Sequence, residues 1–409
     1  MKPYRPSPRH IPELNGLRVL LVFIVSWYHI WQQSWWTPHV GNTSLDFLVR
    51  AGYVPVDGTI LLSGFLLFLP HARAMLLGEK VPDAREFYHK RIMRIVPSYV
   101  FVTLLMLFAV AIPYDLYYGN TGNLVKDVLM HLTFTQTFDF QTYIATPIGV
   151  ASWTVAIEMQ AYLIFPLLAR WARKNPLGTL SSMAAAALLF RGWVVWRMKD
   201  YNMVVNQLIN FLDVYAMGMG ASILYVKLTT LCPEDKRRFA WQAVATLGVV
   251  LAFAGLKELM QAQAGSNGQS EIQAGQMMRR PLFAFLLALL TLSLPFAVRP
   301  IRFLFGNKLM GFLAMVSMNY YLMHQNIAVH LKRIEFPSAQ NYPYPNMTPG
   351  GPEEPWVFQY TFWCFGLSLL TAIAITFLVE KPGAWALRKG FKWLNRAQEG
   401  WMEKRRESK

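Results

Sequence analysis

Four side chains that could take part in proton or group transfer lie inside apolar stretches of the sequence: Arg18, His29, Glu158 and His324. An imidazole can accept a proton near neutral pH, a carboxylate can orient such a ring, and a guanidinium can hold an anionic group. Because burying an ionisable group at membrane depth is costly, each of these residues is a candidate functional residue.

Arg18 and His29 share one apolar stretch. Their separation of eleven residues corresponds to about three helical turns and about 16 Å of rise, so both lie on one helix face. A structural alternative is that Arg18 extends to the membrane surface while His29 is a hydrogen-bonded interior histidine.

Glu158 has no charged neighbour in its own apolar stretch, so it needs a partner from another one. A cation such as Arg18, or a histidine, would serve, and a purely structural ion pair is the alternative.

His324, toward the end of its stretch, is equally compatible with a structural role. Three further interior residues are weaker candidates: Asp57, Arg191 and Asp213.

Arg91 and Arg94 stand three residues apart where another apolar stretch begins. This spacing puts both guanidinium groups on one side of a helix, which suits phosphate binding. The alternative is that they only anchor the helix at the cytoplasmic surface.

The composition indicates that a membrane surrounds these residues, because 54% of the chain is hydrophobic and only 15% is charged. Runs of 17 to 25 apolar residues are long enough to cross a bilayer as helices. We predict an all-α integral membrane protein with about ten transmembrane helices: Gly16 to Trp36, Val54 to Pro70, Ile95 to Ile112, Gly149 to Ala169, Leu177 to Trp196, Asn206 to Tyr225, Trp241 to Gly255, Pro281 to Val298, Met310 to His330, and Trp356 to Val379.

Most Lys and Arg residues fall in alternate connections between these spans, which predicts that both termini are cytoplasmic. The basic groups on that side include Arg5 and Arg9, the Lys236 to Arg238 cluster, and the C-terminal tail. Three longer polar segments are expected as loops on the outer face: Pro113 to Pro147, Glu258 to Arg280, and Lys332 to Pro355.

The remaining features favour a single membrane domain over residues 1–385, followed by a basic cytoplasmic tail over 386–409. The net charge of +16 is spread over short clusters between spans and so indicates topology, not nucleic-acid binding. Neither a cleavable signal peptide nor an internal repeat is visible, and the two cysteines, Cys232 and Cys364, support neither a disulfide framework nor a metal site.

Six motifs in order resemble those of the membrane-bound acyltransferase family 3. They are Asn15-Gly-Leu-Arg18 followed by His29, Leu62-Ser63-Gly-Phe-Leu66, Phe87-Tyr-His-Lys-Arg91-Ile-Met-Arg94-Ile-Val-Pro97-Ser-Tyr99, Ser152-Trp-Thr-Val-Ala-Ile-Glu158-Met-Gln-Ala-Tyr162-Leu-Ile-Phe-Pro166, Ser317-Met-Asn319-Tyr-Tyr-Leu-Met-His324, and Val379-Glu-Lys-Pro382. They cover nearly the whole chain, and the ordered set is far more specific than any single motif.

The resemblance implies a ten-helix core, an acyl-coenzyme A donor on the cytoplasmic side, and sugars of surface glycans or glycosylated metabolites as acceptors. His29 matches the family's catalytic histidine and Arg18 the arginine that precedes it. Arg91 and Arg94 match a pair that meets the donor's phosphates. Met159 stands where many relatives carry a second acidic residue, which leaves Glu158 as the only carboxylate in its motif.

We therefore expect a multi-pass O-acyltransferase of the bacterial inner membrane that uses acyl-CoA, most simply acetyl-CoA, with no bound metal or cofactor. His29 would be the general base and Glu158 its catalytic partner; an acyl-histidine intermediate is an open alternative. Ser63, Asn319 and His324, each within a motif, are assigned to substrate binding. The alternative function is a transporter or flippase of lipid-linked glycans, because buried charges also mark translocation pathways.

Overall fold

The computed structural model describes residues 10–231, 239–337 and 355–393. In these ranges the chain is helical, apart from a two-stranded antiparallel hairpin in which β1 (His39–Val40) pairs with β2 (Thr43–Ser44). Several expected features lie outside the described residues: Arg5, Arg9, Cys232, the Lys236 to Arg238 cluster, most of the Lys332 to Pro355 loop, and the tail from residue 394.

Nine helices of the described chain are long and apolar enough to cross a membrane: Glu13–Ser34, Val56–Leu77, Ala84–Ala111, Pro176–Arg197, Leu208–Leu231, Phe239–Ala264, Gln269–Phe296, Arg299–Arg333 and Trp356–Trp393. They confirm the prediction of an all-helical membrane protein. The expected span from Gly149 to Ala169 is a helix of 22 residues, α7 (Trp153–Lys174). It is not among the nine, because polar residues such as Glu158 and Gln160 lower its hydropathy.

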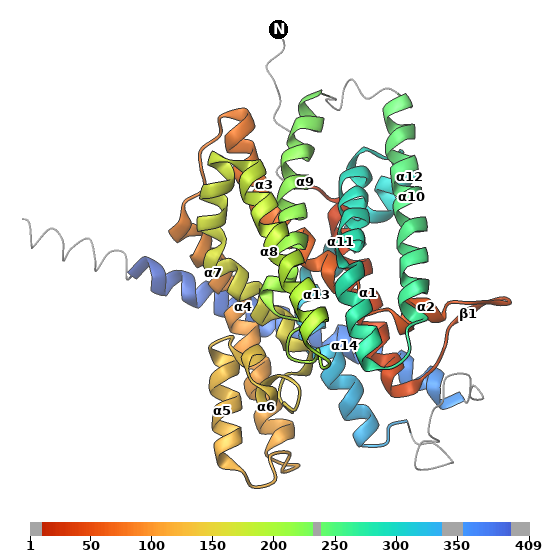
Figure 1. Ribbon diagram of the computed structural model, residues 1–409. Coiled ribbons are helices and arrows are strands. Elements are labelled where there is room, and N and C mark those ends of the chain that lie inside the picture. The colour runs from red at the N-terminus through yellow and green to blue at the C-terminus, as the bar shows by residue number, and fades with distance from the viewer. Residues whose placement is uncertain (1–9, 232–238, 338–354, 394–409) are drawn as a thin grey trace, which may run out of the picture.

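The elements follow one another along the chain as follows: α1 (Glu13–Ser34), α2 (Asp46–Arg50), α3 (Val56–Leu77), α4 (Ala84–Met106) with the π-helix η1 (Leu107–Ala111), α5 (Thr121–Leu132), η2 (Gln136–Phe138), α6 (Phe140–Tyr143), η3 (Val150–Ser152), α7, α8 (Pro176–Arg197), η4 (Leu208–Phe211), α9 (Leu212–Leu231), α10 (Phe239–Ala264), α11 (Gln269–Ser293), η6 (Leu294–Phe296), α12 (Arg299–Gly306), α13 (Lys308–Arg333), α14 (Pro355–Ile375) and the π-helix η7 (Thr376–Glu380). The long helices form one bundle, and α5 and α6 lie together at one end of it (Figure 1).

Two of the expected outer loops contain more helix than predicted. α10 extends to Ala264 and α11 starts at Gln269, so the expected loop from Glu258 to Arg280 shrinks to a short turn around Gly268, whose φ is +83°. The Glu, Gln and Met residues of that segment are good helix formers, which explains the difference. The Pro113 to Pro147 segment likewise contains α5, η2 and α6.

Small residues let the central helices approach closely. Gly64 of α3 faces the backbone of α9, and an added Cβ there would lie 2.6 Å from the carbonyl oxygen of Tyr215. Gly218 of α9 makes the reciprocal approach to the backbone at Leu61. Such glycines are typical of helix contacts in membranes, where packing replaces the hydrophobic effect as the driving force.

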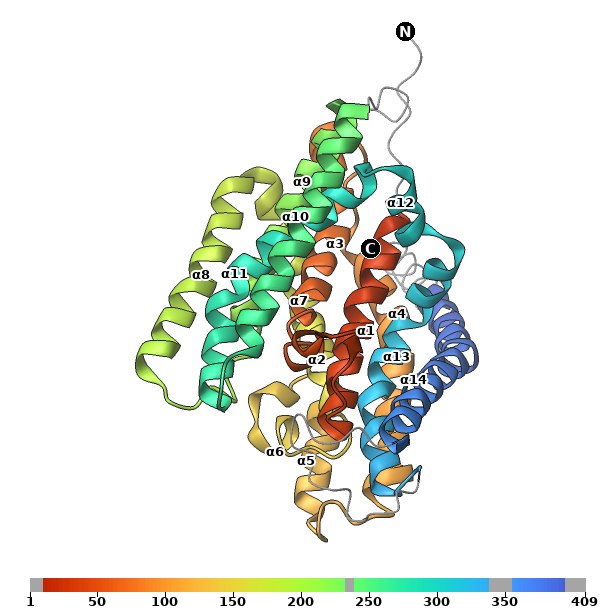
Figure 2. The same ribbon diagram turned by 90° about the vertical axis from the view of Figure 1, so that its right-hand side faces the viewer.

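α1 occupies a central place in the bundle. It packs against α13, α12 and α3, and Figure 2 shows it between the α10 and α11 side and the α13 and α14 side. Two of its polar residues, Arg18 and His29, therefore lie among other helices and can meet groups from several of them.

Candidate active site

His29 is held by the next turn of its own helix. Its Nδ1 lies 3.0 Å from Oε1 of Gln32, and the amide nitrogen of Gln32 donates to the hydroxyl of Tyr28 at 2.8 Å. Because that nitrogen faces Tyr28, the amide oxygen faces His29, so Nδ1 carries the proton and Nε2 is the basic nitrogen. Sequence reasoning missed Gln32; its spacing of three residues from His29 was the available signal.

Tyr28 connects this turn to the segment before α3. Its ring meets that of Tyr53 edge to face, with centroids 5.2 Å apart, and Gln263 donates to the hydroxyl of Tyr53 at 2.5 Å. Burial raises the pKa of Tyr53 to about 12. The phenol therefore stays protonated at neutral pH and serves as a fixed dipole beside the Tyr28 ring.

His324 of α13 lies beside His29, with ring centroids 5.2 Å apart. Its side chain is fully buried, and its Nδ1 is 2.7 Å from the carbonyl oxygen of Tyr321. Nδ1 therefore donates to that carbonyl, and Nε2 is a buried nitrogen without a hydrogen-bond partner in the described part of the chain. The sequence placed His324 among substrate-binding residues, and the structure brings it next to His29.

Glu158 of α7 is bound by a different group. Its Oε2 accepts a hydrogen bond from the hydroxyl of Tyr162 at 2.9 Å, and that hydroxyl is 3.4 Å from Oγ of Ser63 in α3. Tyr162 thus brings together two predicted site residues from separate helices. Among the described residues Glu158 makes no hydrogen bond to His29, so Gln32 orients the imidazole and Glu158 does not.

Three guanidinium groups act electrostatically on Glu158, those of Arg18, Arg91 and Arg94. None of them forms an ion pair within 4 Å of it in the described chain. Arg91 lies over the rings of Phe87 and Tyr162, 5.9 Å from each centroid, and its buried Nε has no hydrogen-bond partner among the described residues. Even with a second carboxylate, that of Glu380, which interacts with Arg94, the three guanidinium groups leave an excess of positive charge, which suits a bound anion.

Asn319 lies one helix over, in α13, and is tied to the C-terminal motif. Its amide nitrogen donates to Glu380 Oε2 and to Thr376 Oγ1, both at 2.7 Å. Glu380 ends the π-helix η7 and also interacts electrostatically with Arg94. Asn319 therefore links α13 to the basic cluster, a connection that the spacing of the motifs in the sequence did not predict.

The weaker interior candidates form a separate ionic cluster. Arg191 binds Asp213 at 2.5 Å, and Arg280 binds Asp57 at 3.1 Å, with all four side chains at most 2% exposed. The two pairs interact electrostatically. The sequence missed Arg280 because it was placed in the expected outer loop.

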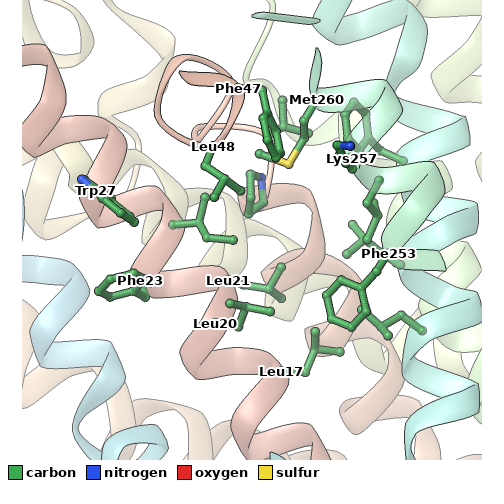
Figure 3. Close-up of a pocket in the computed structure, with 17 residues that line it drawn as sticks. Leu17, Leu20, Leu21, Phe23, Trp27, Phe47, Leu48, Phe253, Lys257 and Met260 are labelled. Atoms are coloured by element: carbon green, nitrogen blue, oxygen red, sulfur yellow. The ribbon is translucent and has the colours of Figure 1, made fainter. Parts of the chain in front are cut away.

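An apolar groove of about 300 Å³ runs along another side of α1 (Figure 3). Leu17, Leu21 and Trp27 line it from α1, Phe253 lines it from α10, and Lys257 is the charged residue on its wall. At about 100° per residue Trp27 points about 180° and Leu17 about 100° away from Arg18. Neither Arg18 nor His29 lines the groove. The described residues also hold no group of three or more His, Cys, Asp or Glu that could bind a metal ion.

Comparison with known proteins shows the family to which the chain belongs. Residues 11–380 match the family model for the acyltransferase 3 family, described as an acyltransferase domain. The O-acetyltransferase OatA of Staphylococcus aureus is 24% identical over 195 residues, which cover 46% of this chain and 30% of that protein. The peptidoglycan O-acetyltransferase OatA of Listeria monocytogenes is 24% identical over 200 residues, covering 46% and 29%.

The acyltransferase MdmB of Streptomyces mycarofaciens is 29% identical over 184 residues, 44% of each chain. The matched regions span less than half the length of each of these relatives. No solved structure matches the chain. Because the family model covers most of the sequence, together with the ordered motifs and the polar centre they form, the chain belongs to the membrane acyltransferase family 3.

Proposed function

We propose that this membrane acyltransferase moves an acyl group, most simply acetyl, from cytoplasmic acyl-CoA to a hydroxyl group of a carbohydrate acceptor. The observation that carries the proposal is that one bundle holds both an excess of basic groups, Arg18, Arg91 and Arg94, and two adjacent imidazoles, those of His29 and His324. The cluster has a net positive charge, and the pair supplies a base.

The donor is large and anionic, which matches the unpaired guanidinium groups. Arg91 has a buried Nε without a partner in the described chain, so a phosphate oxygen would satisfy a group that the protein leaves open. Arg91 and Arg94 would bind the phosphates at the cytoplasmic end, with both chain termini on that side, while the pantetheine arm extends toward His29.

His29 supplies the base. Acyl transfer to a hydroxyl needs a group that removes the hydroxyl proton and a donor that stabilises the oxyanion. Gln32 fixes the tautomer of His29 so that Nε2 is free to accept that proton. Arg18 lies about three helical turns away on the same face of α1, too far to contact the same atom, and so is assigned to the donor.

The acceptor class comes from the relatives. One is named a peptidoglycan O-acetyltransferase, so its acceptor is a sugar polymer outside the cytoplasm. A hydroxyl of a surface glycan or of a lipid-linked sugar is the corresponding acceptor here, and the bacterial inner membrane is the corresponding location.

The test combines purified protein with intact cells. Purified protein in lipid nanodiscs should release free coenzyme A from acetyl-CoA only when a glycan acceptor is added. Mass spectrometry of surface glycans and lipid-linked sugars should show an acetyl mass increment with the intact protein and not with His29→Gln. His330→Gln, the same change on α13 away from the centre, is the matched control. Movement of a glycan across the membrane without coenzyme A release would support a transporter and contradict the proposal.

A further inference from the structure

His324 has features that substrate binding alone does not explain. It is fully buried, it lies 5.2 Å from His29 between ring centroids, and its Nε2 has no partner among the described residues. An unpaired buried polar nitrogen normally costs stability, so its retention calls for an explanation.

The hydrogen bonds of the two histidines fix the same tautomer in both rings. Gln32 Oε1 accepts from Nδ1 of His29, and the Tyr321 carbonyl oxygen accepts from Nδ1 of His324. Each ring therefore carries its proton on Nδ1 and has a lone pair on Nε2. The neutral pair is two adjacent bases without a proton to share, and one added proton would satisfy both.

The surroundings of the pair favour holding a mobile proton. Tyr320 and Tyr321 place their rings 6.2 Å and 5.2 Å from that of His324, so aromatic side chains exclude water from this side. The Tyr320 hydroxyl is engaged with Ser26 Oγ at 2.8 Å. In such a site an N–H···N hydrogen bond between the two rings would be strong, because little water competes for it.

We propose that His29 and His324 form a proton relay in which His324 delivers the proton to the leaving sulfur; this rests on the proposed function. The acceptor O–H bond breaks and its proton goes to Nε2 of His29, while the acceptor oxygen bonds to the acyl carbon. The C–S bond of the thioester breaks and its electron pair leaves with sulfur. The proton passes from His29 to Nε2 of His324 and then to the thiolate, so both rings end neutral and free thiol is released.

In the relay His29 removes the proton of the acceptor hydroxyl, whereas His324 protonates the leaving sulfur. A change of leaving group should therefore affect the variants of these two residues differently. An aryl thioester leaves as a stabilised thiolate that needs no proton, whereas coenzyme A is a poorer leaving group. Loss of His324 should therefore matter much less with an aryl thioester. Loss of His29 should matter with both donors, because the acceptor hydroxyl still has to be deprotonated.

The experiment compares acetyl-CoA with an aryl thioacetate in His324→Gln, His29→Gln and the control His330→Gln, each in nanodiscs. For His324→Gln we expect acetyl-CoA turnover about 100-fold below wild type, the low end of what a positioned acid contributes. With the aryl donor its deficit relative to wild type should shrink at least tenfold. The deficit of His29→Gln should stay the same with both donors.

An equal deficit of His324→Gln with both donors, or its full activity with acetyl-CoA, would overturn the relay while leaving the transferase standing. A wild-type protein that turns over neither donor would overturn the proposed function together with the relay. A second measurement needs no variant: in mixtures of light and heavy water, two protons in flight give a curved dependence of the wild-type rate on deuterium fraction. A straight line would contradict the relay even if His324→Gln failed to fold.

Discussion

Charged side chains of the helices occur in two contrasting arrangements. In the first, three guanidinium groups act on two carboxylates, those of Glu158 and Glu380, without a close ion pair in the described chain. In the same bundle Nε2 of His324 has no partner among the described residues. In the second cluster Arg191 and Asp213, and Arg280 and Asp57, are matched as close ion pairs.

This difference distinguishes a cluster of charges that can bind a ligand from one that holds helices together. A matched pair balances its own charge and joins helices: Arg191 and Asp213 connect α8 to α9, and Arg280 and Asp57 connect α11 to α3. The balance concerns charge, since Asp57 Oδ1 and Arg280 Nη2 have no hydrogen-bond partner among the described residues. An unmatched group keeps binding capacity for something that the protein itself does not supply. A charge on a membrane-spanning helix is therefore an incomplete signal for a site, and whether that charge already has an ion-pair partner supplies the missing information.

The sharpest test of the unmatched centre is His29→Gln. Removing the base should lower acyl transfer by about 10²- to 10⁴-fold. Gln is close in size and uncharged, so the midpoint of thermal unfolding should stay near that of the wild type. Turnover and unfolding of the same purified sample check both expectations. Undiminished turnover would assign His29 to the structural class and remove the contrast.

The matched cluster should respond in the opposite way. Arg191→Met leaves the carboxylate of Asp213 buried without its cation, which should destabilise the protein by about 3–5 kcal/mol. Equilibrium unfolding in detergent measures the loss.

Two further variants complete this comparison. Arg191→Met combined with Asp213→Leu removes both charges and should recover most of the lost stability.

Glu158→Gln keeps a hydrogen-bond acceptor for Tyr162 and should change stability little while lowering turnover. A large stability loss in Glu158→Gln would show that Glu158 belongs with the structural pairs.

The sequence supported only part of this distinction. It identified Arg18, His29, Glu158 and His324 as ionisable residues in apolar stretches, and it expected the membrane bundle that surrounds them. Pairing depends on which helices touch, and contacts between segments more than a hundred residues apart leave no spacing signal. Because the sequence does not show these contacts, Glu158 was expected to be the partner of His29. In the structure Gln32, one turn along the same helix, orients the imidazole instead.

The positions of the helix ends were the second feature that the sequence did not predict correctly. The segment before Pro281 is polar enough to suggest an outer loop, yet it belongs to α11 and carries Arg280 into the interior. Its partner Asp57 lies 223 residues away in sequence. A pattern based on hydropathy alone cannot distinguish a polar loop from a helix whose polar face is buried against another helix.

Arg91→Lys sharpens the comparison within the unmatched centre. Lysine keeps the charge but loses the planar, forked donor group, so binding of a phosphate should weaken by roughly tenfold, or about 1.4 kcal/mol. We expect the KM for acetyl-CoA to rise while kcat changes little, measured by initial rates. Arg85→Lys, on the exposed first turn of the same helix, is the matched control. A fall in kcat at unchanged KM would place Arg91 at the chemical step instead of the donor site.

The smallest effect should come from an ion pair at the surface, between Lys126 of α5 and Asp139 before α6, 2.6 Å apart. Asp139 also caps α6 by accepting from Gln141 N at 3.0 Å, and Asp139→Asn keeps a capping oxygen while removing the charge. The pair lowers the pKa of Asp139. Its stabilisation is therefore present above the unfolded value of about 3.9 and is lost as the pH falls through the lower folded value.

Because Lys126 is exposed and Asp139 partly exposed, Asp139→Asn should cost less than about 1 kcal/mol at pH 7. Thermal unfolding at pH 7 and at pH 3, in low and high salt, measures it. The difference from wild type should shrink at pH 3 and in high salt, since protonation and screening both weaken an exposed pair. A loss as large as that of Arg191→Met, insensitive to salt, would mean that burial does not determine what an ion pair contributes here, and it would undo the contrast between the two kinds of charge.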